Sequence, residues 1–191
     1  MANNAGGTYT IVTNGSTFTM TGTQTTSGSY LQWYGAAASS TMKGSGYETA
    51  DVLALAAMNK AGPNETYAGI TGTLGTVPTS GTASYAGQTV FMLLEPTNTA
   101  DPVHIYNLGA LNINVDFGAL TLIGSAGFTT SLQGDIVGNE FTGTFSTKGA
   151  VNASVTTVPM QGGFYGTNGG TIAGAFAGTG LSGVFGGSIV P

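Results

Sequence analysis

The sequence contains no cysteine and no arginine, and charged residues make up only 6% of it. Without cysteine, disulfides and thiolate metal sites are excluded, although this absence identifies no cellular compartment. Positive charge comes only from Lys43, Lys60 and Lys148, and the net charge is -5. This balance argues against nucleic acids and anionic membrane surfaces as partners, because both are recognised by clusters of lysine and arginine.

The sequence also lacks the parts that most enzymes need. His104 is the only histidine, and no serine stands in a nucleophile-elbow pattern. The acidic residues are dispersed, without the alternating spacing of a calcium-binding loop. We therefore expect a non-enzymatic protein without a metal site.

Long apolar runs are absent as well. The longest one, residues 52–58, is too short for a membrane-spanning helix. Residues 1–4 lack the basic and apolar regions of a signal peptide, so we expect either a mature region with an added Met or another export route. The apolar residues, 41% of the 191, are dispersed along the chain, which favours a folded protein over a disordered one.

The N-terminal part, residues 1–64, predicts a small sheet with one helix. Residues 7–13 and 16–23 alternate apolar and polar side chains around Asn14-Gly15, which is typical of a β-hairpin. Residues 29–36 predict a third strand.

The helix is predicted over residues 49–61. Val52, Leu55 and Ala56 begin an apolar stripe at helical spacing, and Gly62-Pro63 would end the helix. We expect the stripe to pack against the small sheet, with Trp33 against it.

The C-terminal part, residues 65–191, predicts strands throughout. Asn168-Gly169 marks a tight turn, because both residues tolerate positive φ. About eight of the predicted strands would close a barrel that side chains or one small ligand can fill. The predicted strands are 66–74, 80–86, 88–94, 103–106, 110–116, 118–124, 131–137, 140–147, 150–157, 162–166, 171–177 and 182–188.

Several segments, in order, resemble strands of the transferrin-binding protein B type of β-barrel. They are TSGTASYAG (79–87), DFGALTL (116–122), NEFTGT (139–144), GGFYGTN (162–168), IAGAF (172–176) and GVFGG (183–187). The resemblance covers residues 66–191. Surface lipoproteins and haemophilin-type secreted haemophores of Gram-negative bacteria share this barrel.

The resemblance implies a mainly β protein, with residues 1–64 as a sheet-plus-helix handle that leans on the antiparallel barrel of residues 65–191. We expect the last strand, 182–188, to close the barrel by pairing with the first strand, 66–74. The family binds unrelated partners, so its fold alone does not identify the ligand.

The resemblance to haemophores makes haem a candidate cofactor and His104 a candidate axial ligand. Tyr106 is two positions further along the same predicted strand, so it shares a face with His104. The alternative is an ordinary histidine at a strand start, next to an exposed loop of residues 95–102.

A second candidate site is a partner-binding face that includes Tyr30, Tyr34 and Tyr47. Tyrosine is favoured at protein interfaces because its ring is apolar and its hydroxyl forms hydrogen bonds. These tyrosines fall in the N-terminal part, near the predicted helix.

These observations predict a non-enzymatic binding protein that is secreted or lies at the bacterial cell surface. The resemblance implies haem or a protein as its ligand. The alternative is a structural or adhesive subunit that self-associates into homo-oligomers, because low charge gives little self-repulsion and few lysines protect strand edges.

Overall fold

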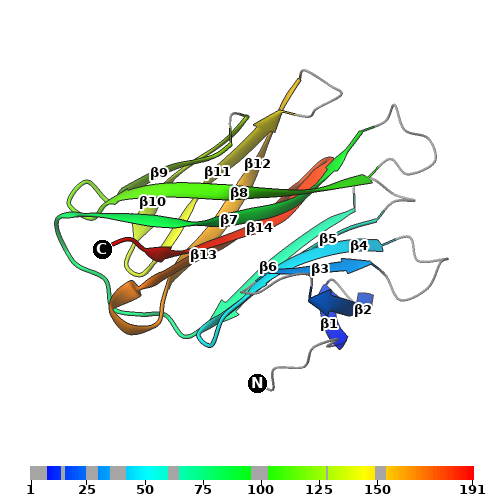
Figure 1. Ribbon diagram of the computed structural model, residues 1–191, viewed down its shortest axis with the longest axis horizontal. Coiled ribbons are helices and arrows are strands. Elements are labelled where there is room, and N and C mark those ends of the chain that lie inside the picture. Colours follow the sequence, from blue (N-terminus) through cyan, green and yellow to red (C-terminus); the bar gives the residue numbers. More distant parts are fainter. Residues whose placement is uncertain are drawn as a thin grey trace.

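Two β-structures make up the fold: a closed barrel of eight antiparallel strands and a six-stranded antiparallel sheet that packs against it (Figure 1). The computed structural model describes residues 8–13, 16–24, 30–34, 42–59, 65–95, 103–127, 129–148 and 154–191. For the described residues up to 42, and for residues 107–109, it describes the backbone alone. The mainly β class and the eight-stranded barrel are therefore confirmed.

The sheet contains the first six strands in sequence order. The predicted N-terminal hairpin is confirmed, since Thr13 of β1 pairs with Ser16 of β2, while Asn14-Gly15 lies outside the described residues. The third predicted strand is also present, as β3. The strands are β1 (Thr8–Thr13), β2 (Ser16–Gln24), β3 (Tyr30–Tyr34), β4 (Met42–Glu48), β5 (Val52–Asn59) and β6 (Thr66–Gly72).

The predicted helix over residues 49–61 is wrong, because β5 occupies its centre and pairs with β4 and β6. A short apolar run satisfies helical and strand spacing equally well, so periodicity could not decide between them. Val52, Ala54, Ala56 and Met58 of β5 are buried at the two-residue spacing of a strand, and Ala57 is buried as well. Pairing with the strands directly before and after it overrides the helical preference of alanine and leucine.

The barrel contains the last eight strands, in the order β10-β11-β12-β13-β14-β7-β8-β9, with β9 pairing back to β10. All neighbours are antiparallel. The strands are β7 (Thr82–Leu94), β8 (Val103–Asp116), β9 (Thr121–Ala126), β10 (Thr130–Val137), β11 (Glu140–Lys148), β12 (Val155–Tyr165), β13 (Thr171–Gly178) and β14 (Leu181–Ile189).

The last strand closes the barrel, but the predicted partner is wrong. Strand β14 pairs with β7, so that Tyr85 lies opposite Ile189 and Leu93 opposite Leu181. Residues 66–72 form β6, which belongs to the six-stranded sheet. The division of the chain into two domains at residue 64 stays a prediction, and the sheet itself extends to residue 72.

Two barrel strands are longer than predicted, because glycines that suggested turns lie inside them. Strand β7 joins the predicted strands 80–86 and 88–94, and β8 joins 103–106 and 110–116. A Cβ atom at Gly87 would overlap the backbone of Gly186, so this glycine permits close approach of β7 and β14.

A short 3-10 turn, η1 (Thr167–Gly169), connects β12 with β13. Asn168 and Gly169 have φ angles of 53° and 63°, which confirms the predicted tight turn. Within the described ranges, no helix is long and apolar enough to cross a membrane.

Aromatic rings fill the interior of the barrel. Phe145 and Phe176 stack with their ring centroids 3.7 Å apart, and Phe141 contacts both Phe164 and Phe185. These side chains are 0–1% exposed. The interior is thus a packed core rather than a ligand cavity, as an eight-stranded barrel allows.

A second apolar cluster joins the sheet to the outer wall of the barrel. It contains Tyr47, Val52, Ala54, Ala56 and Met58 of the sheet and Val103, Ala173, Ala175 and Val184 of the barrel. Polar side chains cross the same interface: Lys43 Nζ donates to the carbonyl of Val103, and Ser45 Oγ donates to that of Val90. The buried lysine thereby finds a backbone acceptor.

Candidate functional site

Strand β8 contains a β-bulge that decides where the predicted ligand residues lie. Gly87 pairs with Leu111, but Thr89 pairs with Leu108, so β8 has one residue more than β7 between these pairs. Ala110 in the bulge has a φ of 62°, which is uncommon for a residue with a Cβ. Because of the extra residue, even-numbered side chains face the barrel core before the bulge, whereas odd-numbered side chains face it after the bulge.

Beyond the bulge, odd-numbered residues such as Ile113 face the barrel core. Before it, Val103 and Ile105 pack in the cluster between sheet and barrel, whereas Tyr106 packs on the barrel core. His104 lies opposite Leu93, a residue of that core. The prediction that His104 and Tyr106 share one face is confirmed, and that face is the inner one.

His104 and Tyr106 meet Glu95 at one end of the barrel; we call these three residues the mouth cluster. Tyr106 donates a hydrogen bond from Oη to Oε1 of Glu95 at 2.6 Å. His104 Nε2 lies 3.8 Å from Oε2 of the same carboxylate. The Tyr106 ring stacks on Phe91, with centroids 5.2 Å apart and planes 21° from parallel, so the phenol is held in place.

Glu95 is a functional candidate that the sequence analysis missed. We predicted it as the first residue of an exposed loop, but its side chain is 3% exposed. The signal was present in the alternation of the strand, since Phe91, Leu93 and Glu95 follow at two-residue spacing. The rest of that loop, residues 96–102, lies outside the described residues.

The mouth cluster does not fit a haem site. Tyr106 uses its hydroxyl proton on Glu95, and Nε2 of His104 faces the same carboxylate. The space behind the cluster is filled by Phe91 and the other core rings. Across the described parts of the chain, no three His, Asp or Glu side chains gather as metal ligands would. Haem ligation by His104 stays a prediction.

Of the three predicted partner-contact tyrosines, only Tyr47 has a described side chain, so the predicted face stays a prediction. Tyr30 lies opposite Tyr47 in the sheet, and Tyr34 opposite Lys43, but the side chains of Tyr30 and Tyr34 lie outside the described residues. Tyr47 does not lie on an exposed face, because its side chain is 3% exposed and is buried between the sheet and β14. It packs the interior and offers no contact area.

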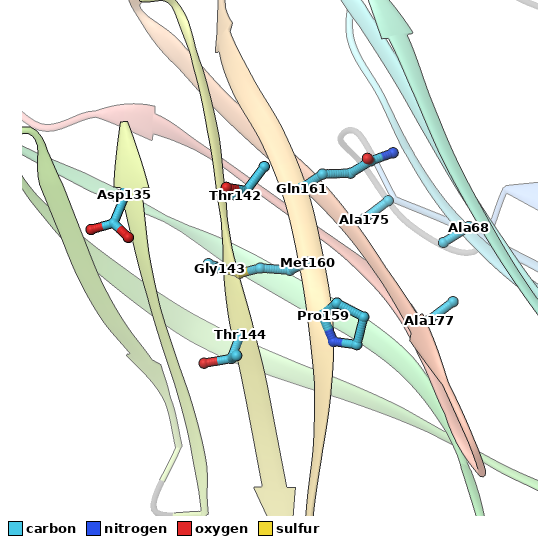
Figure 2. A pocket seen from close by; sticks show the side chains of 10 residues that line it. All are labelled: Ala68, Asp135, Thr142, Gly143, Thr144, Pro159, Met160, Gln161, Ala175 and Ala177. Carbon is cyan, nitrogen blue, oxygen red and sulfur yellow. The ribbon is translucent and has the colours of Figure 1, made fainter. Parts of the chain in front are cut away.

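An open groove lies where the outer wall of the barrel meets the edge of the sheet (Figure 2). Its volume is about 570 Å³. Figure 2 shows barrel strands along one side and Ala68 of β6 on the other. Most of its lining side chains are small, and Asp135 is the one charged residue among them. The lining comprises Ala68, Asp135, Thr142, Gly143, Thr144, Pro159, Met160, Gln161, Ala175 and Ala177.

Large apolar side chains are exposed at the end of the barrel opposite the mouth cluster. Leu120 lies in the turn between β8 and β9 and is 51% exposed, and Val137 at the end of β10 is 76% exposed. The two turns are adjacent, because the amide of Ile136 donates to the carbonyl of Leu120. We call Leu120 and Val137 the turn-end pair. Val155 is a comparable exposed residue at the mouth end.

Two tyrosines near the turn end are buried, and burial raises the pKa of both Tyr85 and Tyr165 to about 12. The negative charge of Glu140 adds to the effect on Tyr165. Tyr85 donates from Oη to the carbonyl of Gly169 at 2.9 Å. These phenols therefore stay protonated and structural at neutral pH.

Comparison with known proteins supports the resemblance found in the sequence. A family model described as the C-lobe and N-lobe β-barrels of Tf-binding protein B matches residues 77–188, more than half of the chain. A search of curated proteins by sequence found no match.

Solved structures with the same fold include a mutant of transferrin-binding protein B from Haemophilus parasuis Hp5. It is 18% identical with a TM-score of 0.62, over 99% of this chain and 42% of that chain. Transferrin-binding protein B from serogroup B Neisseria meningitidis is 16% identical with a TM-score of 0.58, over 87% and 36%. The N-lobe of lactoferrin-binding protein B from Moraxella bovis is 18% identical with a TM-score of 0.51, over 80% and 81%.

These identities show a shared fold. The chain spans about two fifths of the length of the Haemophilus parasuis structure, and the match includes the six-stranded sheet as well as the barrel.

Proposed function

Because the chain belongs to the family of the transferrin-binding protein B β-barrels, we propose that it is a protein-binding module at the surface of a Gram-negative bacterium, and that its partner is a host iron-carrying protein. The names of the similar structures indicate transferrin and lactoferrin as the partner class. Binding, rather than catalysis, is its activity.

The observation that carries the proposal is the filled interior of the barrel. Phe145, Phe176 and the other core rings fill the barrel among the residues that the structure describes, so we expect a ligand to be recognised on the outer surface. An outer surface of strands and turns suits a macromolecule better than a small ligand, which needs a concave pocket.

We place the contact at the turn-end pair. Leu120 and Val137 project large apolar side chains into solvent from adjacent turns, and exposed apolar groups of this kind supply the centre of protein interfaces. The amide of Ile136 donates to the carbonyl of Leu120, which holds the two neighbouring segments together.

The test is surface plasmon resonance with immobilised transferrin and lactoferrin, each in iron-loaded and iron-free form and from several vertebrate hosts. We expect saturable binding to one of them. Leu120→Asp and Val137→Asp should each weaken it at least tenfold. Val155→Asp is the matched control, because it places the same charge on an equally exposed apolar residue at the other end of the barrel. Absence of binding to every form would refute the proposal.

Two alternatives from the sequence stay predictions. No observation in the described residues favours haem, since Tyr106 donates its hydroxyl proton to Glu95 and Nε2 of His104 lies 3.8 Å from the same carboxylate. A structural, self-associating role predicts oligomers that light scattering would detect, whereas the proposed module is expected to remain monomeric without its partner.

A further inference from the structure

Strand β6 is an edge of the six-stranded sheet, with β5 as its only strand partner in the described residues. Its pairing shows which backbone groups point outward. The amide of Asn59 donates to the carbonyl of Glu65 at 3.0 Å, and that of Thr73 donates to Asp51 at 2.9 Å. In an antiparallel ladder, hydrogen-bonded pairs recur at every second residue.

Odd-numbered residues from Glu65 to Thr73 therefore bond to β5. The N–H and C=O groups of the intervening residues, Thr66, Ala68, Ile70 and Gly72, point away from β5 along the free edge. For these eight backbone groups, the described part of the chain supplies no hydrogen-bond partner. The edge thus offers N–H donors and C=O acceptors to another strand over seven residues, a length of about 20 Å at the usual rise of a strand.

This edge has none of the features that usually block pairing with another chain. The sequence of β6, TYAGITG, contains no proline, no lysine and no other charge. Gly69, Thr71 and Gly72 are exposed, and the other residues of β6 are half-buried rather than buried. The start of β6 is nevertheless held against the barrel. Thr66 Oγ1 donates to the carbonyl of Gly178, and Ser182 Oγ donates to the carbonyl of Tyr67.

The groove of Figure 2 lies beside this edge, with Ala68 on the side of β6. Ala175 and Ala177 of β13 keep its floor low, so side chains from an added strand have room to enter it. Asp135 is the one charged group of the lining, and the chain as a whole has a net charge of -5. An incoming segment with lysine or arginine side chains would be attracted there.

We propose that the free edge of β6 and the adjoining groove bind an extended, basic segment of a partner protein, which adds to the sheet as a seventh strand. The outward-pointing N–H and C=O groups of β6 supply hydrogen bonds to the added strand. At alternate positions of that strand, the groove accepts either small side chains or long, positively charged ones. This inference rests on the proposed function, because it gives the partner protein a second point of contact.

The experiment uses the full chain and a synthetic peptide, KVTVKVTVK, as the probe. Titration followed by fluorescence anisotropy is expected to saturate. Amide hydrogen exchange measured by nuclear magnetic resonance should show that Ala68 and Ile70 become protected at least tenfold on adding the peptide. Gly69 and Thr71, which bond to β5, should already be protected without it.

Two variant pairs sharpen the test. Ala68→Pro removes an N–H that points away from β5, so it should weaken peptide binding at least tenfold, whereas Ala68→Ser keeps that N–H and should change binding less than twofold. Asp135→Asn should weaken binding, whereas Glu140→Gln removes an equally exposed charge outside the groove and should not. If Ala68→Pro fails to fold, the exchange pattern of the wild-type protein decides.

Each remaining outcome contradicts the inference. No peptide-dependent protection of Ala68 and Ile70, or equal binding by the proline and serine variants, overturns it. Protection of the same amides that grows with protein concentration and needs no peptide would identify a second copy of the chain as the occupant instead. Transferrin or lactoferrin binding that survives all four variants would leave the proposed function standing while this inference falls.

Discussion

The ring of Tyr47 in β4 lies directly against the backbone of Gly186 in β14, where a Cβ atom would overlap the aromatic carbons. Sheet and barrel therefore touch at a position that has no room for a side chain. The tyrosine acts as a packing residue, and the glycine is required by close approach rather than by its φ angle.

Replacing Gly186 by alanine should destabilise the fold by about 2 kcal/mol, because the added methyl group forces the Tyr47 ring and the sheet away from β14. Urea denaturation measures this change in the free energy of unfolding. Gly69→Ala is the control, since a Cβ there has no atom within 4 Å and should change stability by less than about 0.5 kcal/mol. Equal effects would mean that the sheet does not press on β14.

Phe145→Ala should be more costly, because it removes a fully buried ring that stacks on Phe176 at 3.7 Å. The expected loss is about 4 kcal/mol, from lost apolar burial and the cavity left in the barrel. Val137→Ala, at a side chain that is 76% exposed, should change the denaturation midpoint very little. A small effect at Phe145 would argue against a filled barrel.

Tyr106→Phe should destabilise the mouth end by about 2 kcal/mol, because a buried carboxylate loses its closest donor. The double variant Glu95→Gln with Tyr106→Phe should cost less than the sum of the two single variants. A double-mutant cycle in urea measures this coupling, which we expect to exceed about 0.5 kcal/mol. Strict additivity would show that the hydrogen bond contributes nothing.

Stability should fall between pH 10 and pH 12. The pKa of Tyr85 and Tyr165 is about 12 in the folded chain and 10 in an unperturbed phenol. Above pH 10 the unfolded chain therefore releases protons that the folded chain keeps, so the free energy of unfolding declines as pH rises through this interval and is unaffected below it. Denaturant melts across this range would detect the decline, and Tyr85→Phe should make it shallower. A flat profile would contradict the burial of these phenols.

Haemin should give no Soret shift that depends on His104, because Nε2 of that residue faces Glu95. Titration of the wild-type protein and of His104→Ala, followed by absorbance, makes the comparison. A shift in the wild-type protein that the alanine variant loses would restore the haemophore interpretation and require the mouth cluster to open.

Much of the barrel could be predicted from the sequence, because its strands alternate apolar and polar residues and its turns carry distinctive signals. Asn168-Gly169 is an example: both residues adopt the positive φ that the dipeptide favours. Segments β13 and β14 were located to within one or two residues for the same reason. In these two segments the local pattern and the final structure agree.

Prediction failed where pairing with other strands, rather than the local pattern, decides the conformation. Residues 52–59 are strand because β4 and β6 flank them, although alanine and leucine favour a helix. Residues 66–72 join the sheet rather than the barrel, and no local signal distinguishes these two partners. The inward position of His104 depends on the bulge at Ala110, a residue whose type gives no hint of positive φ.

The pairing that closes the barrel joins Tyr85 to Ile189, which is 104 positions further along the chain. Contacts of such long range are entropically costly to form and tend to make folding slow. During synthesis on a ribosome, the edge of β7 that pairs with β14 stays unpaired until the final strand emerges. The barrel therefore cannot close until nearly the whole chain has been synthesised, and closure depends on β14, the last strand, which is nine residues long.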